Sequence, residues 1–121
     1  MLRDDRDYLL DILRAAELAR DFIEGLDRDG FLHDLKSQAA VIRELEIIGE
    51  AAKQISPRLR DQHPEIPWRS MAGMRDVLIH RYHGVDPNEV WKAVSVAMPE
   101  LIRALQPLVP ADEHEEEDPR S

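Results

Sequence analysis

Cysteine is absent from the 121-residue chain, and aromatic residues make up only 5% of it. Without cysteine there can be no disulfide framework, thiolate metal site or thiol nucleophile, and this composition fits a reducing compartment. No apolar run approaches the roughly 18 residues of a membrane span, and the N-terminal residues lack the pattern of a signal peptide. We therefore expect a cytoplasmic protein with no membrane association, of a length that suits a single domain.

Negative charge is what the chain has in excess, with a formal net charge of −9. The charge is unevenly spread: residues 58–83 carry five basic and three acidic side chains, whereas residues 110–121 carry one basic and six acidic. We expect any phosphate or similar anion to bind in the positive middle window. The acidic residues 110–121 are expected to form a disordered tail that follows a single helical domain of residues 1–109.

Apolar residues recur at helical spacing along most of the chain. A break rich in Asp is expected between Gly25 and Gly30, and Pro99 is expected to bend the last helix. No strand pattern, repeat or Gly-rich phosphate loop is found in the sequence. The fold class that follows is an all-α bundle of four or five helices. The helices are expected at about residues 4–26, 34–55, 57–62, 68–81 and 87–105.

The second of these helices carries two apolar strips. Its main stripe advances by four and three residues, as in a helix that packs along one seam. This stripe consists of Val41, Leu45, Ile48, Ala52 and Ile55, and a second strip beside it consists of Ala40, Ile47 and Ala51. We expect a central helix that packs against more than one neighbour, or a helix that partly meets a second subunit.

The densest polar cluster is the sequence RDVLIHRYH at residues 75–83, which reads R-x4-H-x-Y. At 100° per residue, Asp76 and His80 lie one helical turn apart, so the carboxylate can orient the imidazole and favour its protonated form. Arg75 and His80 differ by about 140°, so one straight helix does not aim both at the same phosphate. Either the helix distorts near His80, or two copies of the chain combine their groups.

These residue types suit RNA cleavage that uses the ribose 2′-hydroxyl as an internal nucleophile and needs no metal. His80 can transfer the proton, because the pKa of imidazole lies near neutral pH. Arg75 can bind the nonbridging phosphate oxygens, and Arg81 and His83 can hold the RNA backbone on either side. The competing interpretation, which spacing alone favours, is that Arg and His at a helix end merely complement the helix dipole.

Two other catalytic arrangements have less support. A metal trio of Asp76, His80 and His83 has no fourth ligand nearby. A triad of Ser70 with His80 and Asp76 has no recognisable oxyanion loop. We therefore expect neither a metal ion nor a cofactor.

Four further residues have plain structural interpretations. Glu50 is equally a buried carboxylate with a partner or a residue of a cleft. Trp68 and Trp91 are expected in the core, with base stacking a secondary role for Trp68. His33 is expected at the surface.

Several spaced blocks of the sequence together resemble the HepT-like toxins, which belong to the HEPN group of all-α ribonucleases. The resemblance covers about residues 5–106, and it is far more specific than the short motif alone. The blocks are LEIIGEAAK at 45–53, HPEIPW at 63–68, GMRDVLIHRY at 73–82, GVD at 84–86 and VW at 90–91.

The resemblance implies an endoribonuclease toxin whose catalytic residues are Arg75 and His80. It implies a homodimer in which the two motifs face each other across a cleft. Tyr82 falls at the position that a partner antitoxin, a minimal nucleotidyltransferase, is thought to modify with AMP. A bulky anion at that position would repel and block the substrate phosphate. Asp76 stands where the family often has Asn, which puts a negative charge beside the phosphate site.

A second class of function is a non-catalytic helical dimer that binds the nucleotidyltransferase and serves as its substrate. Both classes need Tyr82 and a dimer, but only the ribonuclease needs Arg75 and His80 in one cleft. A nucleotide-binding regulator, the third alternative, needs a closed pocket that the sequence does not reveal.

Overall fold

The computed structural model describes residues 3–73 and 86–109 of the chain. Every regular element in these two ranges is helical, so the predicted all-α fold class is confirmed. The elements are α1 (Asp5–Phe22), α2 (Arg28–Leu32), α3 (Leu35–Gln54), α4 (Pro57–Gln62), a helical segment at 68–73, α6 (Pro87–Lys92), the π-helical turn η1 (Ala93–Ala97), α7 (Met98–Leu105) and the 3₁₀ turn η2 (Gln106–Leu108). No described helix has the length and apolar character that a membrane crossing needs.

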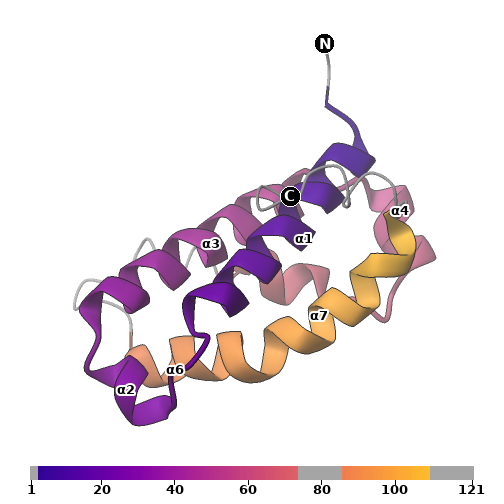
Figure 1. Ribbon diagram of the computed structural model, residues 1–121. Helices are drawn as coiled ribbons and strands as arrows, with labels where there is room; N and C mark the ends of the chain where they lie inside the picture. Colours follow the sequence, from indigo (N-terminus) through magenta and orange to yellow (C-terminus); the bar gives the residue numbers. More distant parts are fainter. Residues whose placement is uncertain (1–2, 74–85, 110–121) are drawn as a thin grey trace, which may run out of the picture.

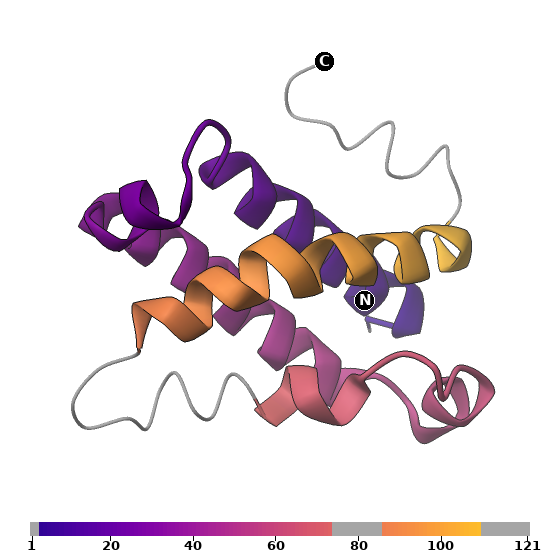
Figure 2. The same cartoon turned by 90° about the horizontal axis from the view of Figure 1, so that it is seen from below.

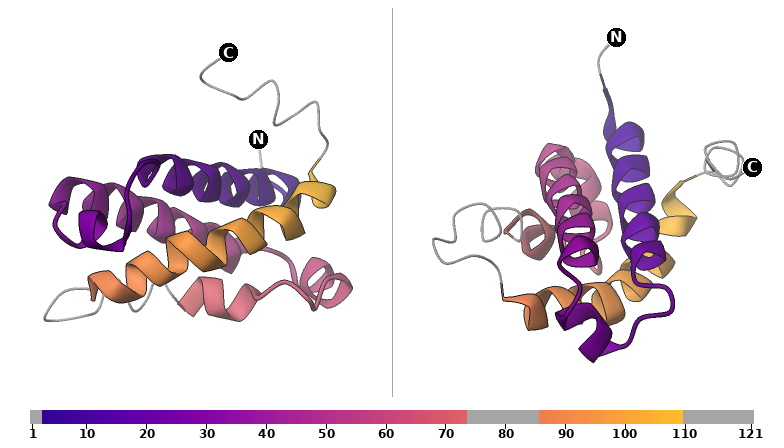
Figure 3. Two further views of the ribbon diagram at one scale, coloured as in Figure 1. Left: turned by 60° about the horizontal axis from the view of Figure 1, so that its bottom comes forward. Right: turned by 60° about the vertical axis from the view of Figure 1, so that its left-hand side comes forward.

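Helices α1 and α3 form an antiparallel pair that is joined at one end by α2 (Figure 1). The continuous rod of α6, η1 and α7 crosses beneath this pair, and its C-terminal end reaches the end of the bundle that holds α4 (Figures 1 and 3). The contact between α1 and α3 is the most extensive in the described part, and α7 packs next most closely on α1.

The core lies where these three helices meet. Helix α1 contributes Ile12 and Leu13 together with the small residues Ala15, Ala16 and Ala19, all of them buried. Small side chains at a helix contact allow a short distance between the two axes. The predicted stripe of α3 from Val41 to Ile55 is buried throughout, with every member at 1% exposure or less. Each large side chain buried in this way stabilises the fold by about 1.5–3 kcal/mol.

The carboxylate of Asp5 ties the start of α1 to the start of α4. It accepts hydrogen bonds from the backbone N–H of Ser56 at 2.8 Å and from the Ser56 hydroxyl at 2.5 Å. The same serine caps α4 as predicted, because its Oγ accepts from the N–H of Leu59 and Pro57 occupies the first turn. A residue 51 positions away in the sequence thus fixes where α4 begins.

The last helix contains a π-helical turn, η1, just before the predicted bend at Pro99. Pro99 has no N–H to donate, and its ring displaces the carbonyl of Ser95 four residues earlier. A wider π turn accommodates both effects without ending the helix. The hydroxyl of Ser95 donates to the carbonyl of Trp91 at 2.6 Å within this turn. The helix predicted at 87–105 is therefore present, although it is divided into α6, η1 and α7.

Helix α2 was not predicted, and this corrects the expected break between Gly25 and Gly30. Gly25 does form the turn, with φ at +83°, a value that favours glycine. Gly30, however, lies inside α2, because the carboxylate of Asp27 accepts from its N–H at 2.7 Å and caps the helix. The N-cap outweighs the low helix propensity of one glycine.

Glu44 is a carboxylate of α3 that the fold largely buries, at 9% exposure. Burial raises the pKa of Glu44, and the nearby Arg43 lowers it to a smaller extent. A carboxyl group with a raised pKa in the folded state favours folding most when it is protonated. Its contribution is therefore lost as the pH rises through the folded-state pKa.

We predict that Glu44→Gln stabilises the protein at pH 7 and that the advantage shrinks as the pH falls below the usual pKa of a glutamate. The reason is that glutamine carries no charge to desolvate. Urea unfolding at pH 7 and pH 4 measures the difference. Glu46→Gln, on the same helix but more exposed, is the matched control and should change stability little. An equal effect of both substitutions at both pH values would contradict the role of burial.

Candidate functional site

The motif residues predicted to carry chemistry lie outside the described residues. These are Arg75, Asp76, His80, Arg81, Tyr82 and His83. What the structure describes is the pair of flanks that bracket the segment 74–85. Figure 2 shows these flanks, the helical segment 68–73 and α6, as separate elements on the same side of the bundle.

The N-terminal flank is anchored by aromatic and aliphatic side chains. Ile66, Trp68 and Met71 are buried at 2%, 6% and 3% exposure. The indole N–H of Trp68 donates to the carbonyl of His63 at 2.9 Å, which fixes the connector that leads into the segment. Trp68 is therefore the core residue expected from the sequence. Ser70 is exposed on the same helical segment.

The C-terminal flank begins at Asp86, whose carboxylate accepts from the N–H of Asn88 at 2.9 Å and caps α6. The Asn88 side chain in turn accepts a hydrogen bond from Arg28 of α2. Val90 of α6 is buried in the core. The centre of the Trp91 ring lies 5.4 Å from the centre of the Phe31 ring. Helix α2, which the sequence did not predict, thus holds the start of α6 in place.

Both flanks of the segment are therefore fixed on the common core. Six described helical residues precede it, and the capped start of α6 follows it. A functional segment needs supports of this kind, because side chains that act together must be held to within a fraction of an ångström. The segment spans 12 residues between two anchored ends.

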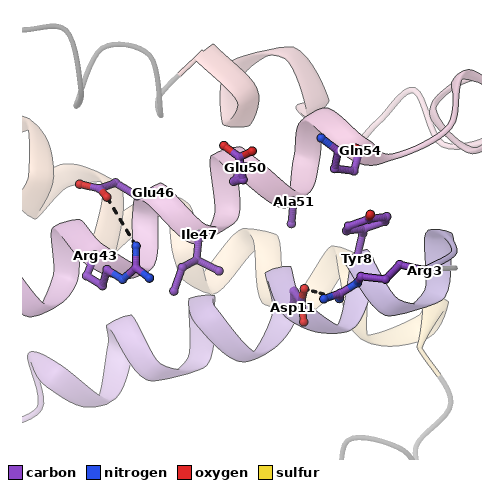
Figure 4. Close-up of a pocket in the computed structure, with 9 residues that line it drawn as sticks. All are labelled: Arg3, Tyr8, Asp11, Arg43, Glu46, Ile47, Glu50, Ala51 and Gln54. Carbon is purple, nitrogen blue, oxygen red and sulfur yellow. Dashed lines mark hydrogen bonds and ion pairs between the residues drawn. The ribbon is translucent and has the colours of Figure 1, made fainter. Parts of the chain in front are cut away.

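A groove of about 330 Å³ between α1 and α3 is a second polar region of the described part (Figure 4). Arg3 lies over the ring of Tyr8, 4.8 Å from its centre, and pairs with Asp11. On the opposite wall, Arg43 lies 3.8 Å from Glu46. We call this region the α1–α3 groove.

Glu50 also lines the α1–α3 groove and is exposed, so it is not the buried carboxylate of the first interpretation. The groove then holds the side chains of two arginines and three carboxylates. Both arginines already pair with carboxylates. This charge pattern disfavours phosphate, so the groove does not extend the anion site expected in residues 58–83.

The described histidines do not form a catalytic or metal cluster. His33 is exposed as predicted, and its Nδ1 lies 2.8 Å from the carbonyl of Asp29. The Nδ1 of His63 lies 3.3 Å from a carboxylate oxygen of Glu65. Within residues 3–73 and 86–109, no group of three metal-ligating side chains comes together. The weaker metal trio and the triad considered above both depend on residues outside those ranges.

Comparison with known proteins decides the family. The family described as "Ribonuclease HepT-like" matches residues 12–108 of the chain. The chain belongs to the HepT-like ribonuclease family. The resemblance seen in the sequence and the expected enzyme class, an endoribonuclease, are thereby confirmed at the level of the family.

The similarity to individual HepT-like relatives extends over nearly their whole length. A Thermococcus cleftensis protein named "Probable ribonuclease HepT" is 52% identical over 101 residues, which are 84% of this chain and 92% of that protein. A Methanocaldococcus jannaschii protein provisionally named as an RNase is 38% identical over 115 residues, 95% of both chains. A third, from Caldanaerobacter subterraneus subsp. tengcongensis and named in the same way, is 35% identical over 108 residues, 89% of this chain and 96% of its own. No solved structure gives a significant match.

For this HepT-like chain we predict that Trp68→Phe lowers the free energy of unfolding by about 1–2 kcal/mol. The ring is kept, but the hydrogen bond to the His63 carbonyl and part of the buried volume are lost. Urea denaturation measures the loss. Trp91→Phe is the matched control and should cost less, because the Trp91 side chain makes no hydrogen bond within the described part. A larger loss for Trp91→Phe would contradict the anchoring role of Trp68.

Proposed function

We propose that this HepT-like protein is a metal-independent ribonuclease toxin that cleaves RNA through Arg75 and His80. The observation that carries the proposal is that the family match over residues 12–108 includes the R-x4-H-x-Y motif at 75–82. The names of the relatives, which describe ribonucleases, support RNA as the substrate.

In the proposed reaction the ribose 2′-oxygen attacks the adjacent phosphorus while the bond to the 5′-oxygen breaks. His80 takes the proton from the 2′-hydroxyl or delivers one to the departing 5′-oxygen, since its imidazole can do either near neutral pH. Arg75 stabilises the negative charge that grows on the nonbridging oxygens. Asp76 supports His80, and Arg81 and His83 bind the RNA backbone.

A homodimer completes the proposed site. The angle of about 140° between Arg75 and His80 on an ideal helix favours a cleft to which both copies contribute. Residues 1–109 form the catalytic domain in this proposal, and the acidic residues 110–121 are a tail outside it. The protein acts in the cytoplasm.

The proposed switch is the attachment of AMP to Tyr82 by a nucleotidyltransferase antitoxin. Tyr82 lies two residues past His80, so a nucleotide on its hydroxyl would place an anion where the substrate phosphate has to bind. Repulsion and steric block then turn the ribonuclease off without unfolding it.

We predict that His80→Ala reduces RNA cleavage at least 100-fold while the protein stays folded, because general acid–base catalysis contributes about 10²–10⁴-fold. Gel assays on unmodified protein measure cleavage, and circular dichroism monitors the fold. His33→Ala is the matched control, since His33 is an exposed histidine of the described part. Undiminished cleavage by pure His80→Ala protein would remove His80 from the mechanism.

We predict that co-expression with the nucleotidyltransferase adds one or more AMP units to the intact mass and abolishes cleavage. Tyr82→Phe, which lacks the acceptor hydroxyl, should stay unmodified at that position and cleave RNA under the same conditions. Mass spectrometry of peptides locates the AMP. If verified unmodified protein cleaves none of several RNAs, the non-catalytic dimer that serves as the nucleotidyltransferase substrate becomes the better interpretation.

A further inference from the structure

A hollow of about 610 Å³ lies between the turn after α1 and the rod formed by α6 and η1. Arg20, Glu24 and Leu26 line one side of it, and Trp91 and Ser95 line the other. We call it the Arg20–Trp91 hollow. It is separate from the α1–α3 groove, with which it shares no residue.

The two tryptophans of the chain differ in a way that the sequence did not reveal. Trp68 is buried and its indole N–H is hydrogen bonded. Trp91 is only partly buried, packs against the fully buried Phe31 and borders the hollow. Its indole N–H makes no hydrogen bond within the described part. The Trp91 ring thus packs against Phe31 and borders the Arg20–Trp91 hollow, and its indole N–H has no acceptor within the described part.

Arg20 supplies the second feature of the hollow. Its Nη1 donates to the carbonyl of Val94 in the π-helical turn at 3.2 Å, which holds the partly buried guanidinium in place. Within the described residues Arg20 forms no ion pair. A guanidinium has five N–H donors, so most of those on Arg20 are available to a ligand at little cost in side-chain entropy.

The surrounding charge argues for a base rather than a phosphate as the ligand. The exposed carboxylates of Asp21 and Glu24 both line the hollow, and they would repel a phosphate. Proteins bind unpaired RNA bases by stacking them on aromatic rings and by hydrogen bonding to their edges. Arginine is the common partner of guanine O6 and N7. A carboxylate accepts from the N1–H and amino group that only guanine presents together.

We propose that the Arg20–Trp91 hollow binds a guanine base of single-stranded RNA, stacked on Trp91 and read by Arg20 and Glu24. The proposal rests on RNA being the substrate of this ribonuclease. Trp91 lies four residues beyond the first residue of α6, a rise of about 6 Å along its axis. A base held there would fix the register of the strand close to the segment 74–85.

The two tryptophans also allow a direct test. In a ¹H–¹⁵N spectrum the chain gives two indole signals, which Trp91→Phe assigns, and Trp68 serves as an internal control for the fold. The probes are two short 2′-O-methyl oligonucleotides, one with a single guanosine among uridines and one with uridines alone. Neither can be cleaved, because the attacking hydroxyl is blocked. Guanosine 5′-monophosphate tests whether a free nucleotide is bound instead.

We expect the guanosine oligonucleotide to shift the Trp91 signal with saturation and to leave the Trp68 signal unmoved. The uridine oligonucleotide and free nucleotide should bind at least about tenfold more weakly. Glu24→Gln and Arg20→Gln should each weaken binding of the guanosine oligonucleotide about tenfold. Arg103→Gln is the control, because it removes the same charge from an exposed position of α7.

An unmoved Trp91 signal, or a shift that is the same for both oligonucleotides, would overturn the proposal. Stronger binding of the free nucleotide would assign the hollow to a nucleotide ligand instead of RNA. Because the probes are not substrates, these results do not depend on the proposed catalytic residues. If cleavage is detected, Glu24→Gln should raise KM for a guanosine-containing RNA about tenfold and leave kcat unchanged, a split that a loss of folding does not produce.

Discussion

The packing of α1 on α3 is the contact on which the other elements depend. Helix α1 contributes buried alanines and larger apolar side chains, and α3 contributes its buried stripe. Two of the smaller elements are attached to this pair by polar links. The Gln38 amide donates to the carbonyls of Phe31 and Leu32 and holds α2. Asp5 holds α4 through Ser56. A cavity in the α1–α3 contact would therefore loosen elements that make few apolar contacts of their own.

The last helix shows how a local rule and the tertiary structure combine. Pro99 alone requires only that the helix bend or break. In this chain the π-helical turn takes up the mismatch, so the rod continues from Pro87 to Leu105 with apolar residues buried on both sides of the turn. The turn also brings the Val94 carbonyl to Arg20, which links the rod to α1. A sequence feature that looks like an interruption thus fixes the position of α6 relative to the rest of the core.

Much of this arrangement could be predicted from the sequence, because hydrophobic spacing and capping residues are local signals. The stripe from Val41 to Ile55 and the Ser56–Pro57 start of α4 are present as expected. Helix α2 was not predicted, because the hydrogen bond from the Gly30 N–H to the Asp27 carboxylate outweighs the low helix propensity of that glycine. The different surroundings of Trp68 and Trp91 could not be predicted either, since they depend on which elements pack around each ring.

The candidate site, too, could be predicted from the sequence only in part. The motif at 75–83 could be read from residue types and spacing, and the family comparison supports its interpretation. Residues 74–85 lie outside the described part, so the predicted roles of Arg75, His80 and Tyr82 stay predictions. The π-helical turn that brings Val94 to Arg20 leaves no signal in the sequence beyond Pro99. Surface hollows formed between distant segments cannot be found by periodicity.

The acidity of the chain constrains how it can hold RNA. With a net charge of −9, the protein as a whole repels a polyanion, so attraction has to be local. Exposed Arg58 and Arg69 precede the segment 74–85 and lie inside the positive window at 58–83. Stacking and hydrogen bonds to base edges, in contrast, need no positive field. An acidic ribonuclease can therefore combine a few phosphate contacts near its catalytic residues with base recognition elsewhere. In the proposed binding mode, selectivity comes from unpaired bases, while the negative surface discourages the non-specific binding that a basic protein shows toward any nucleic acid.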